Sequence, residues 1–371
     1  MSSEYLSISE TSSAFLIRHS RHLRQANPLE TPSRTWPYAG SGLISVKLAE
    51  KTDTTSRSPR LRWKRPACIL LALLVIWVTV GFLATMPIVG NHPFWRRMRA
   101  RPQDFVLKAQ DVSFSSTDGI PLRAWFIAAE GTPRATVILA HGIDGNRSDM
   151  LPRAWFLVRD HYNTLVVDLR AHGDSGGNYA TPGYMEAFDI QGAISYLRRS
   201  RPDRGPIILF GHSYGAVAAL YAASQSQDVA AVISDSAYIS FENMMRRATT
   251  LLAQDPERSY WDRLGLRLAG SRVAEWVVVP IYYLRTGVWP SSEKADALLA
   301  IPEIKCPILF IAGARDRICP PDNTRLMYDA ARNPQKDLLI VPNADHDSTF
   351  AQAPHLYEAT VKRFLDNALP H

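Results

Sequence analysis

The stretch from Pro206 to Ser224 constrains the fold of this chain more than any other. An apolar run, Ile207–Phe210, has the length of a buried strand, and Gly211-His212-Ser213-Tyr214-Gly215 follows it as a G-x-S-x-G pentapeptide. Small helix formers then run from Ala216 to Ala223. Strand, pentapeptide and helix in this order are the context of a nucleophile elbow. The sequence therefore predicts a sharp turn with Ser213 as a catalytic nucleophile; the alternative is an ordinary glycine-rich turn.

Seven further segments have the length and pattern of strands. They are Phe105–Ser115, Pro121–Ala129, Ala135–Ala140, Thr164–Leu169, Val229–Ser234, Pro307–Ala312 and Lys336–Val341. The first two are predicted to form a hairpin, and helical spacing appears between later ones, as in Met185–Arg199. Short apolar strands that alternate with helices are typical of a mostly parallel sheet covered by helices on both faces. The sequence thus predicts an α/β domain over residues 104–371 with an eight-stranded sheet.

Residues 237–304 interrupt this alternation. Almost seventy residues separate two predicted strands there, and a structureless loop of that length is rare in a compact domain. The segment is helix-like, and its aromatic residues include Trp261, Trp276, Tyr282, Tyr283 and Trp289. We expect a helical cap over the carboxyl ends of the strands, with residues 274–289 lining an acyl pocket. The alternative is a set of helices packed beside the sheet.

A serine nucleophile needs a base and an acid that orients the base. Asp316 follows the strand Pro307–Ala312, and His346 lies in the loop after the last predicted strand. Both would then reach the same edge of the sheet as Ser213. Asp235 is a rival acid, with a helix cap as its other role. The alternatives for Asp316 and His346 are a surface ion pair and an exposed loop.

Two backbone amides are candidates for an oxyanion hole. The amide after the nucleophile belongs to Tyr214, and Ile143 follows His141-Gly142 at the end of the strand Ala135–Ala140. The sequence contains neither H-E-x-x-H nor paired cysteines with metal-ligand spacing, so we predict no metal and no cofactor. His141, His172 and His212 are predicted to bond loop backbone.

The segment Cys68–Met86 contains nineteen residues without a charge. At about 1.5 Å per residue, such a helix matches a bilayer core of roughly 30 Å. It begins too far from Met1, and lacks the cleavage site, for a signal peptide. We therefore predict a single transmembrane anchor over residues 67–89, with residues 90–103 as a juxtamembrane linker and Trp95 at the headgroups.

Residues 1–66 carry eleven Lys and Arg against five Asp and Glu, and are rich in Ser, Thr and Pro. This composition predicts a disordered basic tail. No aromatic-basic motif accompanies it, so we expect no nucleic-acid partner. Six basic residues lie shortly before the anchor and four shortly after it. This excess favours a cytoplasmic amino terminus and hence an extracytoplasmic catalytic domain.

These motifs together carry a family resemblance. They are His141-Gly142 with Asn146-Arg147-Ser148, the run from Asp168 to Ser175, Gly211–Gly215, Asp316 and His346. From about residue 104 to 369 the chain resembles an α/β-hydrolase. It is similar to bacterial serine hydrolases related to dienelactone hydrolases and to acylglycerol- and acyl-protein-cleaving enzymes. The resemblance implies Ser213 as nucleophile, Asp316 as acid, His346 as base, and Ile143 and Tyr214 as oxyanion donors.

The expected function is that of a membrane-anchored serine hydrolase. Its substrate would be a carboxylic ester or thioester of small or lipid-derived acyl groups, and its partner the bilayer. Two alternatives stay open: a peptidase or amidase on the same triad, and a non-enzymatic membrane scaffold of the same fold.

Overall fold

The computed structural model describes residues 64–86, 89, 93–289 and 296–369. The predicted disordered tail therefore falls almost wholly outside the described residues. The strands are β1 (Ala109–Ser115), β2 (Pro121–Ile127), β3 (Ala135–Ala140), β4 (Tyr162–Asp168), β5 (Ile207–His212), β6 (Val229–Asp235), β7 (Ile308–Gly313) and β8 (Lys336–Val341). The α-helices are α1 (Lys64–Thr85), α2 (Pro93–Arg96), α3 (Leu151–Arg159), α4 (Glu186–Ser200), α5 (Tyr214–Ser224), α6 (Phe241–Leu252), α7 (Tyr260–Ala269), α8 (Arg272–Thr286), α9 (Ala297–Ala300), α10 (Pro321–Ala330), α11 (Thr349–Gln352) and α12 (Pro354–Ala368). Short 3₁₀ turns cover Pro102–Phe105, Arg147–Met150 and Ile301–Glu303.

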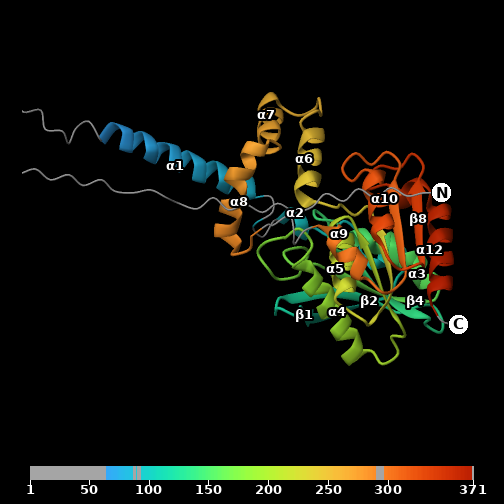
Figure 1. The fold of residues 1–371 in the computed structure, drawn as a ribbon. Helices are drawn as coiled ribbons and strands as arrows, with labels where there is room; N and C mark the ends of the chain where they lie inside the picture. The colour runs from blue at the N-terminus through green and yellow to red at the C-terminus, as the bar shows by residue number, and fades with distance from the viewer. Residues whose placement is uncertain (1–63, 87–88, 90–92, 290–295, 370–371) are drawn as a thin grey trace, which may run out of the picture. The chain divides into compact units, whose positions relative to one another are not determined.

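The strands form one eight-stranded sheet in the order β1-β2-β4-β3-β5-β6-β7-β8 (Figure 1). β2 runs antiparallel to both of its neighbours, and every pair from β4 to β8 is parallel. The predicted eight-stranded, mostly parallel sheet is thus confirmed. Because β5, β6, β7 and β8 are parallel, the loops that leave their carboxyl ends meet at one edge.

Alternating side chains of each strand enter two separate cores. In β7, Ile308 and Phe310 belong to the core on one face, and Leu309 and Ile311 belong to the core on the other. Helices α4, α5 and α10 cover the first face, and α3 and α12 cover the second. This is the reason β3, β5 and β7 are apolar and buried almost throughout, whereas the edge strand β1 alternates between exposed and buried residues.

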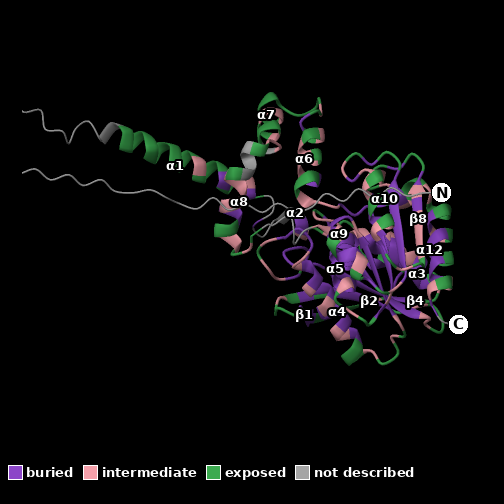
Figure 2. Cartoon of the chain, viewed as in Figure 1, coloured by how far each residue is buried: buried purple, intermediate pink, exposed green. Residues whose placement is uncertain are grey.

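Helix α1 contains the predicted anchor. Its segment Pro66–Thr85 has 20 residues and is long and apolar enough to cross a membrane, and 6% of an 18-residue window within it is buried. Leu70, Leu74 and Ile76 are each more than half exposed. Figure 2 shows most of α1 in the colour of exposed residues. Among the described helices, α1 alone meets this criterion.

Trp95, in the segment predicted as a juxtamembrane linker, packs against the domain. Trp95 was expected at the headgroups, but it is 6% exposed, and its ring stacks on His172 at 4.4 Å. Its carbonyl oxygen accepts hydrogen bonds from the backbone N–H of Gly173 and from the side-chain amide of Asn146. The expected placement of Trp95 is wrong because a stacking partner lies far along the chain, where no local pattern reveals it.

The segment between β6 and β7 is helical in its described part. It contains α6, α7, α8 and α9, and α6 to α8 carry much more exposed surface than the sheet domain (Figure 2). The aromatic side chains expected to line an acyl pocket are largely exposed: Trp276 by 80%, Tyr283 by 45% and Trp289 by 53%. Tyr282 is the exception, since it is buried and its hydroxyl donates to the carbonyl oxygen of Ala180 at 2.8 Å.

Candidate active site

The turn between β5 and α5 holds Ser213 in a strained backbone conformation. Its φ is 51° and its ψ is −113°, a left-handed region that costs free energy for a residue with a side chain. The turn is tight enough that a Cβ on Gly211 would lie 2.2 Å from the carbonyl oxygen of Gly215. A Cβ on Gly215 would lie 2.4 Å from the carbonyl oxygen of Ala140. Both glycines are therefore required by close backbone contacts.

Replacing Gly211 with alanine should destabilise the fold strongly. The added methyl group would meet backbone atoms, which cannot move aside as a flexible side chain can, so we expect a loss of about 3 kcal/mol or more in the free energy of unfolding. Gly265→Ala is the matched control, because a Cβ there meets nothing within 4 Å. Thermal unfolding of both full-length variants in detergent measures the difference. Equal melting temperatures would contradict the tight turn.

His346 lies between Ser213 and Asp316. Its Nε2 is 2.9 Å from the Ser213 Oγ, and its Nδ1 is 2.8 Å from an Asp316 carboxylate oxygen. With the proton on Nδ1, the ring donates to Asp316 and accepts from the serine hydroxyl. The structure thus brings together the three residues predicted as nucleophile, base and acid.

The loops that carry Asp316 and His346 are in direct backbone contact. β7 and β8 are neighbours in the sheet, and the backbone N–H of Arg315 donates to the carbonyl oxygen of Ala344 at 2.8 Å. A Cβ on Gly313 would lie 2.5 Å from that same oxygen. The other carboxylate oxygen of Asp316 accepts from the amides of Ile318 and Cys319, at 2.9 and 2.7 Å. Asp316 is therefore fixed in orientation before it contacts the imidazole.

The environment of His346 favours its charged form. Burial by itself would lower the pKa of His346, but the hydrogen bond to the Asp316 carboxylate and the nearby Cys319 outweigh burial and raise the pKa. The carboxylate therefore stabilises the imidazolium that forms when the ring takes a proton from serine. Since only the neutral ring can take that proton, a raised pKa moves the acid limb of the pH–rate profile upward.

The predicted oxyanion donors, Ile143 and Tyr214, belong to segments next to Ser213. A Cβ on Gly142 would lie 3.8 Å from the Ser213 Cβ, so the loop after β3 approaches the serine closely. In the described part of the chain, neither the Ile143 amide nor the Tyr214 amide has a protein acceptor. His172 Nε2 bonds to the carbonyl oxygen of Ile143, which holds that peptide in place. Among the described residues, neither N–H group is bonded to a backbone carbonyl, as the predicted role requires.

The rival acid, Asp235, is engaged elsewhere. It is fully buried and accepts hydrogen bonds from Arg153 at 2.7 Å, Tyr357 at 2.7 Å and Thr349 at 3.0 Å. Burial raises its pKa, but the Arg153 guanidinium more than offsets this, so the pKa is lowered overall. Asp235 is therefore an ion-pair partner beneath the histidine loop, and the imidazole of His346 is bonded to Asp316 instead.

Of the three histidines predicted to bond loop backbone, His141 and His172 do so. His141 accepts from the backbone N–H of Leu169 at 3.1 Å and contacts the carbonyl oxygen of Gly142 at 2.7 Å. Burial, together with His172, lowers the pKa of His141 well below its usual range, so the ring is neutral. His172 bonds to the carbonyl oxygens of Arg170 and Ile143. These rings fix the loops around Ser213.

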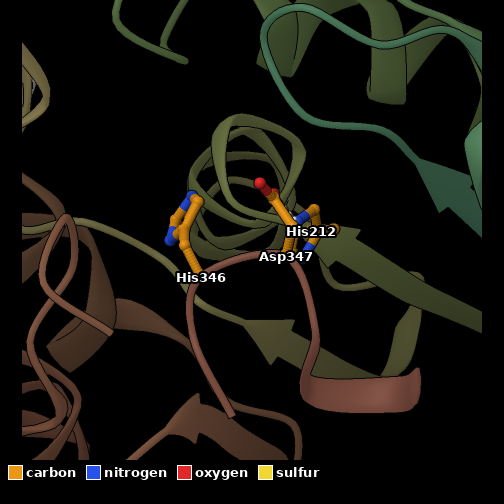
Figure 3. Close-up of side chains that lie close together, drawn as sticks. All are labelled: His212, His346 and Asp347. Atoms are coloured by element: carbon orange, nitrogen blue, oxygen red, sulfur yellow. Dashed lines mark hydrogen bonds and ion pairs between the residues drawn. The ribbon is translucent and has the colours of Figure 1, made fainter. Parts of the chain in front are cut away.

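His212 differs from the prediction because it meets side chains. Its Nε2 is 3.3 Å from Asp347, whose side chain lies beside it (Figure 3). Its Nδ1 is 3.6 Å from an oxygen of Asp235. Burial would lower the pKa of His212, but these carboxylates raise it. The pair connects the residue before the nucleophile to the residue after the base. Sequence reasoning missed it, although the adjacency of Asp347 to His346 was a usable signal.

The cluster of His212, His346 and Asp347 does not fit a metal site. Their ligand atoms lie within 4.8 Å of one another, as do those of Asp316, Cys319 and His346. Both groups depend on His346, whose two ring nitrogens already face Asp316 and Ser213. A cation could bind only after the imidazole left these partners, so the arrangement suits proton transfer.

Comparisons with known proteins agree with this geometry. A family model described as "Alpha/beta hydrolase family" matches residues 137–360, which is more than half of the chain. The chain belongs to the α/β-hydrolase family.

Among its relatives, this α/β-hydrolase is similar to the uncharacterized protein YqkD of Bacillus subtilis, with 30% identity over 68% of this chain and 77% of that protein. It is also similar to the α/β-hydrolase domain-containing protein WAV2 of Arabidopsis thaliana, with 27% identity over 70% of this chain and 80% of WAV2. A structure of the Pyrococcus furiosus esterase Pf2001 superposes with a TM-score of 0.63 at 24% identity, covering 76% of this chain and 99% of the esterase. The family match supports hydrolase activity in general, and the likeness to the esterase structure shows the fold alone.

Proposed function

We propose that this protein is a serine hydrolase that cleaves a carboxylic ester or thioester through an acyl-enzyme. The observation that carries the proposal is the position of His346, 2.9 Å from the Ser213 Oγ and 2.8 Å from Asp316. An imidazole held between a hydroxyl and a buried carboxylate is arranged to remove the hydroxyl proton as the oxygen attacks. Ser213 is then the nucleophile, His346 the base and Asp316 the orienting acid.

The reaction would proceed in two balanced halves. Ser213 Oγ adds to the substrate carbonyl carbon while its proton moves to Nε2 of His346, and the oxyanion accepts from the Ile143 and Tyr214 amides. Collapse breaks the bond to the leaving alcohol or thiol, which takes the proton from His346. Water then gives a proton to Nε2 of His346 as its oxygen attacks the acyl carbon. Collapse of this second intermediate breaks the bond between the acyl carbon and Ser213 Oγ, which takes the proton back from His346 as the carboxylic acid leaves.

The test is covalent labelling of the membrane fraction with a fluorophosphonate, which reacts with activated serines. We expect one labelled band from the full chain and none from Ser213→Ala. An unlabelled wild-type chain would favour the scaffold alternative. Assays with esters, thioesters and peptides of matched acyl group then separate the ester reading from the amidase reading.

We also propose that α1 anchors the enzyme in a bilayer, with the catalytic domain on the extracytoplasmic side. The support is the exposed apolar surface of Pro66–Thr85 and the excess of basic residues before it. The esters nearest to such an enzyme are lipid-derived, which makes them the favoured substrate class.

The full chain should remain in the membrane pellet after an alkaline carbonate wash. A Leu73→Arg, Ile76→Arg double variant should be released, since each charge near the centre of a span costs roughly 2.5 to 3.5 kcal/mol. Leu326→Arg, at an exposed site on α10, is the control and should stay in the pellet. Release of the unmodified chain by carbonate would rule out the anchor.

The side of the membrane is tested separately. Protease added to intact cells should digest the catalytic domain.

A further inference from the structure

Helix α8 of the insertion packs directly on α1, at the end of α1 that leads to the catalytic domain. A Cβ on Gly81 would lie 2.5 Å from a side-chain carbon of Ile281 and 3.0 Å from the carbonyl oxygen of Val277. The two helices therefore approach closely because position 81 has no side chain, as is common where helices meet within a membrane. Figure 1 shows α8 beside the domain-proximal end of α1.

Arg285 closes this contact at the end of α1. Its guanidinium donates to the Thr85 hydroxyl at 2.6 Å and to the carbonyl oxygens of Phe82 and Val89 at 3.3 and 3.0 Å. The same group lies 4.3 Å from the centre of the Phe82 ring. The carbonyl oxygen of Phe82, in the last turn of α1, thus faces a cation, which stabilises the negative end of the helix dipole. An arginine at the end of a span typically reaches toward the headgroups.

These contacts fix the depth at which α8 must lie if α1 crosses a bilayer. Gly81 is four residues before Thr85, the end of the apolar segment. At 1.5 Å per residue, this places the contact with Val277 and Ile281 about 6 Å inside the end of the span. Interfacial helices bury their apolar faces about 5–10 Å into the boundary between headgroups and acyl chains. Helix α8 is therefore held at that boundary by its packing on α1.

The remaining surface of α8 has the composition that such a boundary favours. Trp276, Tyr283 and Leu284 expose 80%, 45% and 73% of their surface, and Trp289 follows the helix with 53% exposed. On a helix, positions 276, 283 and 284 share a stripe beside the stripe that contacts α1. Trp and Tyr are enriched at membrane–water interfaces because their rings are apolar with a polar tip. A face that is this apolar would otherwise remain exposed to water.

Helix α8 is also connected to the nucleophile helix. The Tyr282 hydroxyl donates to the carbonyl oxygen of Ala180, and Glu186 accepts from the nearby backbone amides of Thr181 and Gly183. A Cβ on Gly183 would lie 2.7 Å from a side-chain carbon of Val217, which is on α5. The loop that holds α8 thus packs against the helix that begins after Ser213.

We propose that α8 is a second membrane-contacting element, which lies in the interface of the bilayer crossed by α1 and admits lipid esters to Ser213 from that bilayer. This proposal rests on the proposed hydrolase function only for its substrate. The occupant of the apolar face is the acyl-chain boundary of a lipid bilayer. The contact of α8 with α1 supports this assignment, because it makes the exposed stripe continuous with the surface of the predicted span.

The first test measures depth without reference to activity. The full chain, with Cys68→Ser to remove its exposed thiol, receives Trp276→Cys or the control Leu356→Cys on α12, and each thiol is labelled with an environment-sensitive fluorophore. The chains are reconstituted in phosphatidylcholine vesicles that contain lipids brominated on the acyl chain. We expect strong quenching at position 276 and none at position 356. Equal, weak quenching at both sites overturns the proposal.

A second copy of the chain is the other possible occupant of this face. In that case the fluorophore at position 276 would be quenched by a spin-labelled second copy and not by brominated lipid. This result would also overturn the proposal.

The second test uses substrate. Trp276→Asp with Leu284→Asp should lower kcat/KM at least tenfold for a long-chain ester embedded in vesicles and less than twofold for a water-soluble acetate. Leu326→Asp with Leu356→Asp, on α10 and α12, is the control. Equal losses on both substrates, or no loss, overturn the role in substrate entry. If no Ser213-dependent hydrolysis occurs at all, the proposed function fails, while the depth measurement still decides the position of α8.

Discussion

Replacing Ser213 with alanine should lower kcat by about 10⁴- to 10⁶-fold, and His346→Ala should have a similar effect. The two residues share one hydrogen bond of 2.9 Å and one proton transfer, so the loss of either removes the same step. The double variant should therefore be hardly worse than either single variant. The measurement is steady-state hydrolysis of a chromogenic ester by purified full-length protein in detergent, with thermal unfolding as the check on folding.

Near-additive losses in the double variant would contradict this assignment. They would mean that the serine and the histidine act in separate steps. The remaining activity would then have to come from a group other than Ser213, even if Ser213→Ala folds and is not labelled by the fluorophosphonate.

The second large effect distinguishes the two buried carboxylates, because replacing Asp316 should lower kcat and replacing Asp235 should lower stability. Asp316→Asn should lower kcat by about 10⁴-fold with little change in the melting temperature, because the side-chain amide favours the wrong imidazole tautomer. The amides of Ile318 and Cys319 can still donate to its remaining oxygen, so the loop should keep its shape.

Asp235→Asn is the matched variant, and its main effect should be on stability. It leaves the Arg153 guanidinium buried without a counter-charge, and breaking such a pair costs about 3 kcal/mol or more in the free energy of unfolding. Measuring both kcat and the free energy of unfolding for each variant shows which carboxylate acts in catalysis and which in stability. A catalytic loss for Asp235→Asn that exceeds that of Asp316→Asn would reverse the assignment.

The sequence was sufficient for the sheet and for the placement of Ser213, Asp316 and His346. The central strands β3, β5 and β7 are apolar runs, and the residues that follow them must gather at one edge of a parallel sheet. Gly211 and Gly215 marked the tight turn because no other residue fits it. These features are local or follow from chain order, so they can be derived without coordinates.

The features that were missed depend on partners distant in sequence. Trp95 has the composition of a headgroup anchor, and only the fold shows its stacking on His172. Arg153 lies on α3, and no local sequence pattern indicates that it pairs with Asp235. The aromatic residues of α8 were expected to line a pocket because an acyl pocket and a lipid-facing surface have the same composition. Only exposure distinguishes them.

The packing of Trp95 has a consequence for how the enzyme would meet its substrate. Nine residues separate Thr85 from Trp95, and the chain on both sides is fixed, by helix α1 and by the contacts of Trp95 with His172 and Gly173. If α1 crosses a bilayer as proposed, so short a tether keeps the domain close to the plane of the membrane. Encounters with substrate would then take place in two dimensions, and turnover would follow the mole fraction of ester in the bilayer. Adding inert lipid would slow the reaction even when the total amounts of enzyme and ester stay the same.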